Sequence, residues 1–503
     1  MNRAGSTSLG HHPSRVAAVE ERLAAAGERL RAHVLAALWR ANATRTPVIA
    51  WTSIGISSPD PVELFGRGMA AKADPMLWER PADGRSLVGI GRAWEFTAEG
   101  PDRFEQARDA WQRVLAGAIG DGETSSEARG ASGQASGTAG PVLMGGFSFS
   151  PGGPGTPAWS GFAAASLVLP RVAVSTEGSE GCATLSVVVH PAAADLDEAE
   201  CGVGESLVML RGLLGGAGIP REEMAWQIIA RDESTPAAAW KSLVARAAET
   251  VRRRDLTKVV VARSLKVSGA GFDPMRTLCR LRADYRTCTI FAIARDGRCF
   301  LGATPERLVR VRGRDVSAMA LAGSAPRGRT DDEDRRLGES LLTSAKDRVE
   351  HAVVVEMLRE ALDGACSSVT VAGAPSLLQV SNVQHLYTPI AARLRDDTTI
   401  LDLVGRLHPT PAVGGVPRQA ALEWIHRHEG LDRGWYAGPI GWLDHRGDGE
   451  FAVAIRSALL SGREALLYAG CGIVADSDPD AEYEESRLKL RPLLAALGAN
   501  GGA

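Results

Sequence analysis

The sequence predicts an α+β protein with a large, mostly antiparallel sheet, and three observations carry that prediction. Short segments rich in β-branched and aromatic residues, bounded by Gly, Pro or Ser, recur along the chain and are typical of strands. Amphipathic stretches with helical spacing lie between them at irregular intervals, so the regular alternation that predicts a parallel sheet is missing. With 45% hydrophobic and 23% charged residues among 503, the chain has ample core material for a folded globular protein.

The first residues, 1–45, are predicted to form a helical segment. Within residues 14–40, apolar residues such as Leu30 and Val34 recur at helical spacing, with Glu and Arg between them. Residues 46–225 follow as a strand-rich half. Strands are expected there within residues 46–54, 86–96, 142–150, 164–174 and 183–190. Gly, Ser and Ala dominate residues 120–140, which cannot bury a core, so this stretch is predicted to be a flexible surface loop.

Residues 226–498 are predicted to be the catalytic region, which begins after a Gly- and Pro-containing stretch near residue 215. Strands and helices are mixed in this half. Strands are expected within residues 257–267, 288–294, 299–311 and 457–474, and helices within residues 332–364 and 481–498.

Composition excludes several classes of function. The 57 basic and 60 acidic residues give a formal net charge of −3, so the chain has no electrostatic reason to bind nucleic acid or an anionic membrane. No stretch approaches the roughly 20 apolar residues that span a bilayer, and the first residues lack the apolar part of a secretory signal. The seven cysteines form no C-x-x-C pair, so a reducing, cytoplasmic environment is expected. Fingerprints of nucleotide cofactors are also missing.

Two residues are candidates for acid–base chemistry. Lys258 opens an apolar strand in which alternation places Val260 on the same face. If that face is buried, the ammonium loses hydration, which favours the neutral amine of a general base; a strand-end lysine that reaches solvent is the alternative. Glu306 follows a Gly-Ala-Thr-Pro turn after a strand that ends at Leu301, and a half-buried carboxyl group there would suit a general acid. An exposed turn glutamate paired with Arg307 or Arg310 is the alternative for Glu306.

Three glutamates on two predicted helices are candidates for a metal site. Glu350 lies in the first helix, and Glu482 and Glu485 lie near the start of the last one. Mg²⁺ prefers one or two carboxylates together with water and ligand oxygens, so one glutamate from each helix would make a plausible site. A surface ion-pair ladder explains the same spacing, because Lys489 follows Glu485 at i+4.

Arg456 is the one charged residue within the apolar run FAVAIRSALL, which is predicted to be a strand. A buried arginine requires a bidentate anion, and either a substrate carboxylate or an intramolecular glutamate would serve. Gly-rich segments such as LAGSAPRG, YAGPIGW and YAGCGIV offer backbone N–H groups that could hold a carboxylate.

Taken in order, these segments resemble the chorismate-binding enzyme family, which includes isochorismate synthase, salicylate synthase and the anthranilate and aminodeoxychorismate synthase components. The resemblance extends from about Lys258 to Gly498, whereas the first half resembles the family only in its strand-rich character and in GGFSFSP. Nine ordered motifs carry it: KVVVARS, GATPERL, LAGS, SAKDRVEH, VQHL, LHPTPAVGG, YAGPIGW, FAVAIRSA and AGCGIVADSDPDAEYEES.

This resemblance implies a large fold of packed, mostly antiparallel sheets surrounded by helices, and it assigns roles to residues. Lys258 would be the base that activates water, and Glu306 the acid that protonates the departing 4-hydroxyl group. Glu350 and Glu485, with Glu482 beside them, would hold Mg²⁺. The residues that it implies for substrate binding are Ala322, Gly323, Ser324, His385, Tyr436, Arg456, Gly470, Gly472 and Lys489.

The resemblance also favours one chemistry within the family. Members that use ammonia carry Gln where this chain has Lys258, and they typically read Pro-Ile-Ala-Gly-Thr where residues 320–324 read Ala-Leu-Ala-Gly-Ser. Lys258 implies addition of water to chorismate, and the second difference disfavours an anthranilate synthase. The expected activity is therefore that of an isochorismate synthase, an isomerase that needs no glutaminase subunit and is expected to be a monomer.

Two alternatives stay open. A salicylate synthase would form isochorismate and then eliminate pyruvate in the same pocket, but the His-Pro-Thr-Pro run in LHPTPAVGG resembles the isomerases more. A chorismate-binding protein without activity should have lost an acid, a base or a metal residue, and this chain retains all of them. The sequence leaves open whether the product feeds menaquinone, siderophore or salicylate synthesis.

Overall fold

The computed structural model describes residues 13–121, 139–191, 196–215, 228–380 and 383–498. Most of the predicted loop at 120–140 lies outside the described residues. The α-helices are α1 (Pro13–Thr44), α2 (Pro61–Ala70), α3 (Arg103–Leu115), α4 (Leu196–Gly215), α5 (Ala237–Arg252), α6 (Pro274–Asp284), α7 (Asp331–Thr343), α8 (Ala345–Asp363), α9 (Ile400–Leu407), α10 (Arg418–His428) and α11 (Pro479–Ala496). Short 3₁₀ helices cover Pro81–Asp83 and Pro157–Trp159.

The first half contains the strands β1 (Val48–Ser57), β2 (Met76–Arg80), β3 (Arg85–Ala98), β4 (Ile119–Gly120), β5 (Val142–Phe147), β6 (Ala165–Glu177) and β7 (Glu180–Val189). The second half contains β8 (Ile228–Glu233), β9 (Lys258–Gly269), β10 (Thr289–Arg295), β11 (Arg298–Thr304), β12 (Arg307–Arg312), β13 (Asp315–Pro326), β14 (Cys366–Val371), β15 (Ser376–Gln379), β16 (Val383–Leu394), β17 (Gly415–Val416), β18 (Pro439–Asp444), β19 (Gly449–Val453), β20 (Ser457–Ser461) and β21 (Glu464–Ile473).

Backbone pairing joins these strands into one network that divides at β6. Every described strand pair is antiparallel except β1 with β4, which confirms the predicted mostly antiparallel α+β architecture. Along one edge β6 pairs with β3, and along the other it pairs with β5 and β7. From β3, a first arm runs through β2, β10, β11, β20 and β21 to β9. From β5, a second arm runs through β18, β19, β12 and β13 to β16.

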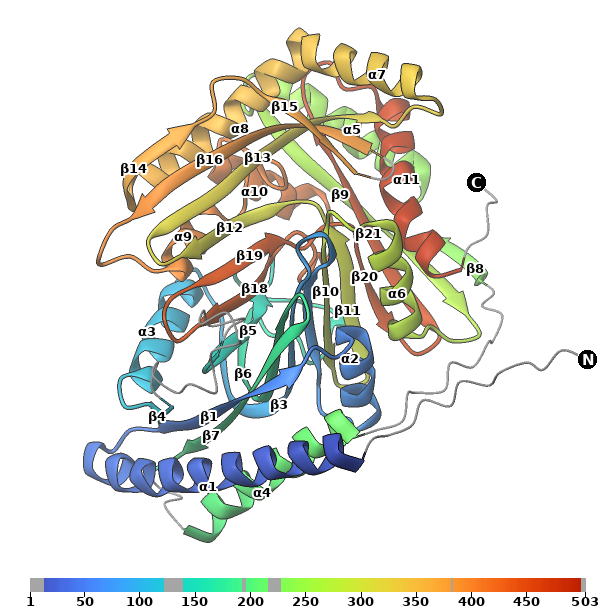
Figure 1. Cartoon of the computed structure of the whole chain (residues 1–503). Helices are drawn as coiled ribbons and strands as arrows, with labels where there is room; N and C mark the ends of the chain where they lie inside the picture. Colours follow the sequence, from blue (N-terminus) through green and yellow to red (C-terminus); the bar gives the residue numbers. More distant parts are fainter. Residues whose placement is uncertain (1–12, 122–138, 192–195, 216–227, 381–382, 499–503) are drawn as a thin grey trace, which may run out of the picture.

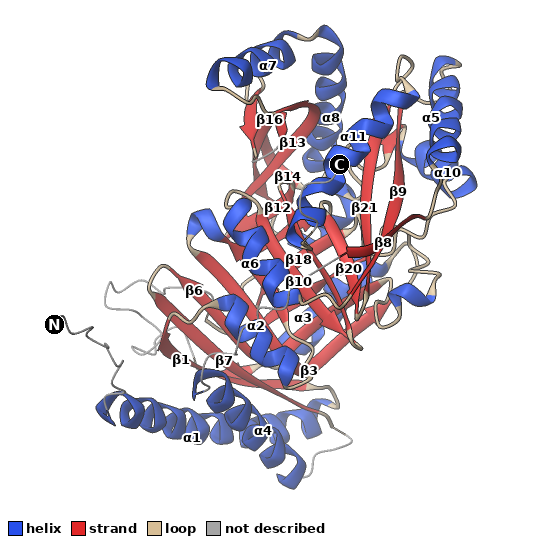
Figure 2. Cartoon of the chain, turned by 90° about the vertical axis from the view of Figure 1, so that its right-hand side faces the viewer, coloured by secondary structure: helices blue, strands red, loops and turns tan. Residues whose placement is uncertain are grey.

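Helices cover the outer faces of the network (Figures 1 and 2). α1 packs on β1 and α4, α8 packs on β13 and β14, and α11 packs on β21. The helix predicted within residues 14–40 is confirmed as α1, which buries Leu30 and Val34 against the sheet. None of the described helices combines the length and apolarity that crossing a bilayer demands.

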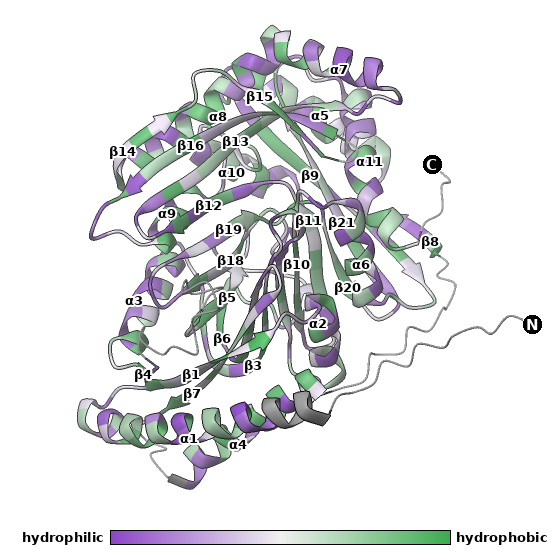
Figure 3. Ribbon diagram, in the orientation of Figure 1, coloured by the Kyte–Doolittle hydropathy of each residue, from purple (hydrophilic) through white to green (hydrophobic). Residues whose placement is uncertain are grey.

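The largest apolar core lies between the two arms. Val259 and Phe300 from the first arm belong to the same buried cluster as Val309 and Ile390 from the second. Figure 3 shows the hydrophobic character of central strands such as β9, in contrast to the many hydrophilic residues of α7. Because burial of apolar surface is the main favourable term in folding, this shared core holds the two arms together.

The prediction of one continuous helix over residues 332–364 is wrong. Ser344 has extended backbone angles, so it ends α7, and its hydroxyl accepts a hydrogen bond from the amide of Asp347 as the N-cap of α8. Helical periodicity continues across this point without Gly or Pro, which hides the break in the sequence. The break matters because it starts a new helix at Ala345, and the first turns of α8 line the cavity described next.

Candidate active site

One cavity of about 170 Å³ lies where the far ends of the two arms face each other. The first arm lines it with residues of β9 and β21, and the second with residues of β13 and β16. The starts of α8 and α11 and the loops that follow β11, α9, α10, β19 and β21 complete its wall. The structure brings every residue of the predicted site to this cavity: Lys258, Glu306, Ala322, Gly323, Ser324, Glu350, His385, Tyr436, Arg456, Gly470, Gly472, Glu482, Glu485 and Lys489.

Lys258 points into the cavity from the first position of β9. It is 6% exposed, and its Nζ donates a 2.5 Å hydrogen bond to Oε1 of Glu350 on α8. The solvent-exposed alternative for Lys258 is therefore wrong. On the neighbouring strand β21, a Cβ at Gly472 would lie 2.5 Å from Cε of Lys258, so a side chain there would displace the end of this lysine.

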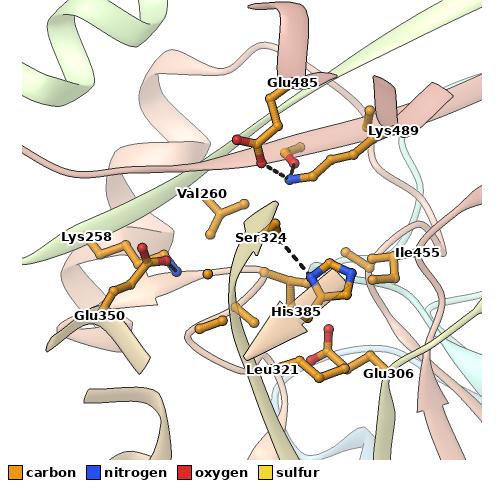
Figure 4. Close-up of a pocket in the computed structure, with 18 of the residues that line it drawn as sticks. Lys258, Val260, Glu306, Leu321, Ser324, Glu350, His385, Ile455, Glu485 and Lys489 are labelled. Atoms are coloured by element: carbon orange, nitrogen blue, oxygen red, sulfur yellow. Dashed lines mark hydrogen bonds and ion pairs between the residues drawn. The ribbon is translucent and has the colours of Figure 1, made fainter. Parts of the chain in front are cut away.

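Glu306 lies across the cavity from Lys258 (Figure 4). It follows Pro305 in the link between β11 and β12, where its carbonyl oxygen accepts a 3.0 Å hydrogen bond from the amide of Val453. The strand before it was predicted to end at Leu301, but it continues to Thr304. This hydrogen bond helps to fix the backbone from which the Glu306 side chain projects.

Burial raises the pKa of Glu306 to about 7. A 3.3 Å hydrogen bond from Oγ1 of Thr410 and the charge of Lys258 favour the carboxylate and offset part of this rise. The predicted alternative partners, Arg307 and Arg310, pair instead with Glu450 at 3.3 and 3.5 Å. Glu306 is therefore a buried carboxyl group that can gain and lose a proton near neutral pH.

Carboxylates from α8 and α11 meet at the cavity. Glu350 faces it from α8, and Glu482 and Glu485 face it from α11, which begins with Asp478 as its N-cap. Oε1 of Glu482 accepts a 2.8 Å hydrogen bond from Oγ of Ser477. Carboxylate oxygens of Glu482 and Glu485 lie within 4.8 Å of each other and of Sγ of Cys471, whereas Glu350 pairs with Lys258. Carboxylates are the hard oxygen donors that Mg²⁺ prefers, so the two glutamates of α11 fit the predicted metal.

The two glutamates of α11 differ in charge environment. Burial, followed by the charge of Glu485, raises the pKa of Glu482. The ammonium of Lys489, at 2.6 Å, lowers the pKa of Glu485. The i,i+4 ion pair proposed as an alternative is thus real, but it lies at the cavity, where Nζ of Lys489 also donates to the carbonyl oxygen of Gly470 at 2.9 Å. On the same helix, Glu484 pairs with Arg487 on the exposed surface.

Arg456 supplies a second cation at the cavity. The prediction of a continuous strand through FAVAIRSALL is wrong, because residues 454–456 separate β19 from β20 and Arg456 has a φ of +52°. Residues other than glycine rarely adopt this left-handed backbone conformation. Backbone strain of this kind is typical of functional sites. Within the described part of the chain, its buried guanidinium makes no hydrogen bond or ion pair, so the glutamate-partner alternative is wrong. Arg456 can therefore receive the carboxylate of a ligand.

Neutral polar groups line the remaining wall. A β-bulge at Gly323, with a φ of +78°, turns Ser324 toward His385, and Oγ of Ser324 lies 2.8 Å from Nδ1 of His385. Burial lowers the pKa of His385 to about 3, so the imidazole is neutral, and its buried Nε2 has no hydrogen-bond partner among the described residues. Burial likewise raises the pKa of Tyr436 to about 12 and keeps its phenol protonated.

Several cavity residues escaped the sequence analysis. Lys346 and Asp347 precede Glu350 by four and three positions, which places them on the same face of α8. Tyr468 shares a face of β21 with two predicted glycines at period two, and its ring stacks on Tyr436 with centroids 5.1 Å apart. The spacing of Lys346, Asp347 and Tyr468 from predicted site residues could therefore have identified them from the sequence. By contrast, no local pattern marks Arg433, which reaches the cavity from the loop after α10.

Comparison with known proteins identifies the family. The profile of the family described as "Chorismate binding enzyme" matches residues 35–498. This chain belongs to the chorismate-binding enzyme family. The match covers most of the described strand network, including the first half, where the sequence alone resembled the family only loosely.

Two relatives match almost the whole length of this chorismate-binding enzyme. The salicylate biosynthesis isochorismate synthase of Pseudomonas aeruginosa is 38% identical over 478 residues, which cover 93% of this chain and 94% of the relative. The isochorismate synthase MenF of Bacillus subtilis is 35% identical over 480 residues, which cover 93% of this chain and 97% of the relative.

Solved structures confirm the fold class. The menaquinone-specific isochorismate synthase MenF from Escherichia coli superimposes with a TM-score of 0.72 and 26% identity, covering 93% of this chain and 100% of that chain. Anthranilate synthase component I from Streptococcus pneumoniae shares the fold with a TM-score of 0.65 at 20% identity.

Proposed function

We propose that this enzyme is an isochorismate synthase that converts chorismate to isochorismate with Mg²⁺. The observation that carries the proposal is the placement of Lys258 and protonated Glu306 on opposite sides of one cavity. An acid and a base that act on opposite ends of one allylic system need this placement. The names of relatives that match almost the whole chain support the same reaction.

In the proposed reaction, Lys258 accepts a proton from water as its oxygen forms a bond to C2 of chorismate. The ring double bonds shift, the bond from C4 to its hydroxyl oxygen breaks, and Glu306 protonates the departing oxygen, which leaves as water. Reactant and product differ only in hydroxyl position, so no oxidant or reductant is consumed. Solvent exchange returns the proton from Lys258 and restores that of Glu306.

The remaining residues bind and orient the substrate. Arg456 binds the enolpyruvyl carboxylate through its two-pronged guanidinium, and the phenol of Tyr436 lies beside it. Glu350, Glu482 and Glu485 would hold Mg²⁺, which would supply positive charge for the ring carboxylate of the substrate. In the structure Nζ of Lys258 donates a hydrogen bond to Glu350, and we expect this contact to be released when Glu350 binds the metal.

Lys258 in place of glutamine supports water as the nucleophile, so we expect the enzyme to act without a glutaminase subunit and as a monomer. None of the seven cysteines forms a disulfide in the structure, which supports a reducing, cytoplasmic location.

Product analysis tests this function. Purified enzyme is incubated with chorismate and Mg²⁺, and the products are separated by chromatography while a coupled assay measures pyruvate. We expect isochorismate without pyruvate, and loss of turnover when a chelator is added. Stoichiometric pyruvate and salicylate would instead identify a salicylate synthase, and unchanged chorismate would contradict both activities.

A further inference from the structure

A buried ion pair at the wall of the cavity has no role in the reaction proposed above. Glu429 follows α10, and Arg433 lies in the next loop with 4% of its surface exposed. Nε and Nη2 of Arg433 donate to the two carboxylate oxygens of Glu429 at 2.7 and 2.6 Å, which makes a bidentate ion pair. The guanidinium also lies over the ring of Phe149, at 4.1 Å from the centroid.

This pair completes the backbone pairing of β9, the strand that carries Lys258. β21 pairs along one edge of β9, while β17 covers Lys258 and Val259 on the other edge and β8 resumes only at Leu265. In the gap, Nη2 of Arg433 donates to the carbonyl oxygen of Val260 at 2.8 Å, and Glu429 accepts from the amide of Ala262 at 2.8 Å. Two side chains thus supply the donor and acceptor of a missing strand.

The same guanidinium also holds the loop behind the acid. Nη1 of Arg433 donates to the carbonyl oxygen of Val413 at 2.9 Å. Val413 closes a turn on Thr410 through a 3.1 Å backbone hydrogen bond, and the hydroxyl of Thr410 donates to Glu306. A continuous series of hydrogen bonds therefore connects the strand of Lys258 to the carboxyl group of Glu306 through Arg433.

We infer that the Arg433–Glu429 pair is a positioning device that sets the general base against the general acid. This inference rests on the proposed function, because the two groups must act on one substrate at a fixed separation. Stability alone explains the pair poorly, since apolar replacements of buried ion pairs are often neutral or stabilising. The planar fork of Arg433 instead fixes two backbone segments at once, which a lysine with its single ammonium nitrogen does not do.

The test compares Arg433→Lys with Arg427→Lys, a control on α10. Arg427 forms an i,i+4 pair with Glu423, but that pair is exposed. Misplacement of reacting groups by about 1 Å costs up to about 100-fold in rate, so we expect Arg433→Lys to lower kcat about 10- to 100-fold. KM for chorismate should stay within about threefold, because the binding groups are untouched. The control should keep the kcat of the unaltered enzyme.

Two further variants separate positioning from simple destabilisation. In the double variant Arg433→Lys with Thr410→Val, the losses in kcat should be less than multiplicative, because both substitutions interrupt the same series of bonds. Glu429→Gln keeps the size of the side chain but replaces an acceptor by a donor, and it should reproduce the loss of kcat at unchanged KM. If Arg433→Lys does not fold, the kcat and KM of Glu429→Gln test the positioning role instead.

The outcomes are distinguishable from a failure of the proposed function. If the unaltered enzyme and the Arg427→Lys control form no isochorismate, the function itself is wrong. If they do and Arg433→Lys or Glu429→Gln matches their kcat per folded molecule, the inference is wrong. It is also wrong if KM rises while kcat is unchanged, or if the double variant shows fully multiplicative losses.

Discussion

The protonation of Glu306 sets the pH range of the reaction at the scale of single residues. Its pKa of about 7 means that the carboxyl group loses its proton as pH rises through that value, so kcat should fall on the alkaline side. Thr410→Val removes a hydrogen bond that favours the carboxylate. The pKa should then rise, and the alkaline limb of the kcat profile should move upward by about one pH unit or less. A limb that stays in place or moves to lower pH contradicts the assignment of Glu306.

Lys258 offers a second test at this scale. Lys258→Ala removes the proposed base, and kcat should fall by about 10²- to 10⁴-fold. Lys266→Ala is the matched control, because Lys266 lies on the same strand but forms an exposed pair with Glu464. Steady-state kinetics with circular dichroism of both variants makes the comparison. Normal turnover in folded Lys258→Ala enzyme would show that another group activates water.

At the scale of elements, α11 presents Glu482 and Glu485 to the cavity and the intervening Glu484 to solvent. Glu485→Gln should weaken Mg²⁺ binding about tenfold or more, because a neutral amide is a poorer ligand for a hard cation. Glu484→Gln is the control, since Glu484 pairs with exposed Arg487. Calorimetric titration with Mg²⁺ measures both without relying on turnover. Equal affinities in the two variants would leave Glu485 as a structural partner of Lys489.

The break between α7 and α8 makes a prediction about stability. Ser344→Ala removes the N-cap of α8 and should lower the free energy of unfolding by about 1 kcal/mol. Thr343→Ala is the control, because the hydroxyl of Thr343 bonds only within α7 and is exposed. Denaturant titration measures the difference. If both variants unfold at the same denaturant concentration, Ser344 does not set the start of α8.

At the scale of the whole molecule, the two arms share one core and one cavity, so a ligand should stabilise them together. Chorismate with Mg²⁺ at about 100 times its Kd should add about 2.7 kcal/mol to the free energy of unfolding. Glu306→Gln, which should not consume the ligand, is the form to use. Differential scanning calorimetry should show one transition that moves upward as a unit. A shift confined to one of two transitions would mean that the arms unfold separately.

The sequence reveals much of this fold but not its long-range pairing. Alternating apolar residues predict β9, and helical spacing predicts α1, because both patterns are local. The ordered motifs place every predicted site residue at one cavity. Partners such as Thr410 for Glu306 and Arg433 for β9 come from distant segments, and no local pattern records which segments meet. The division of the sheet at β6 is equally non-local.

Two glycines of β21 limit how the substrate specificity of this cavity can change during evolution. Gly470 and Gly472 present main chain where other strands present side chains, and a Cβ at either would meet Tyr436 or Lys258. A side chain at either position would therefore displace a proposed catalytic or binding group as well as narrow the cavity. We expect new specificities to arise on the opposite wall, from β13, where Leu321 and Ser324 line the cavity.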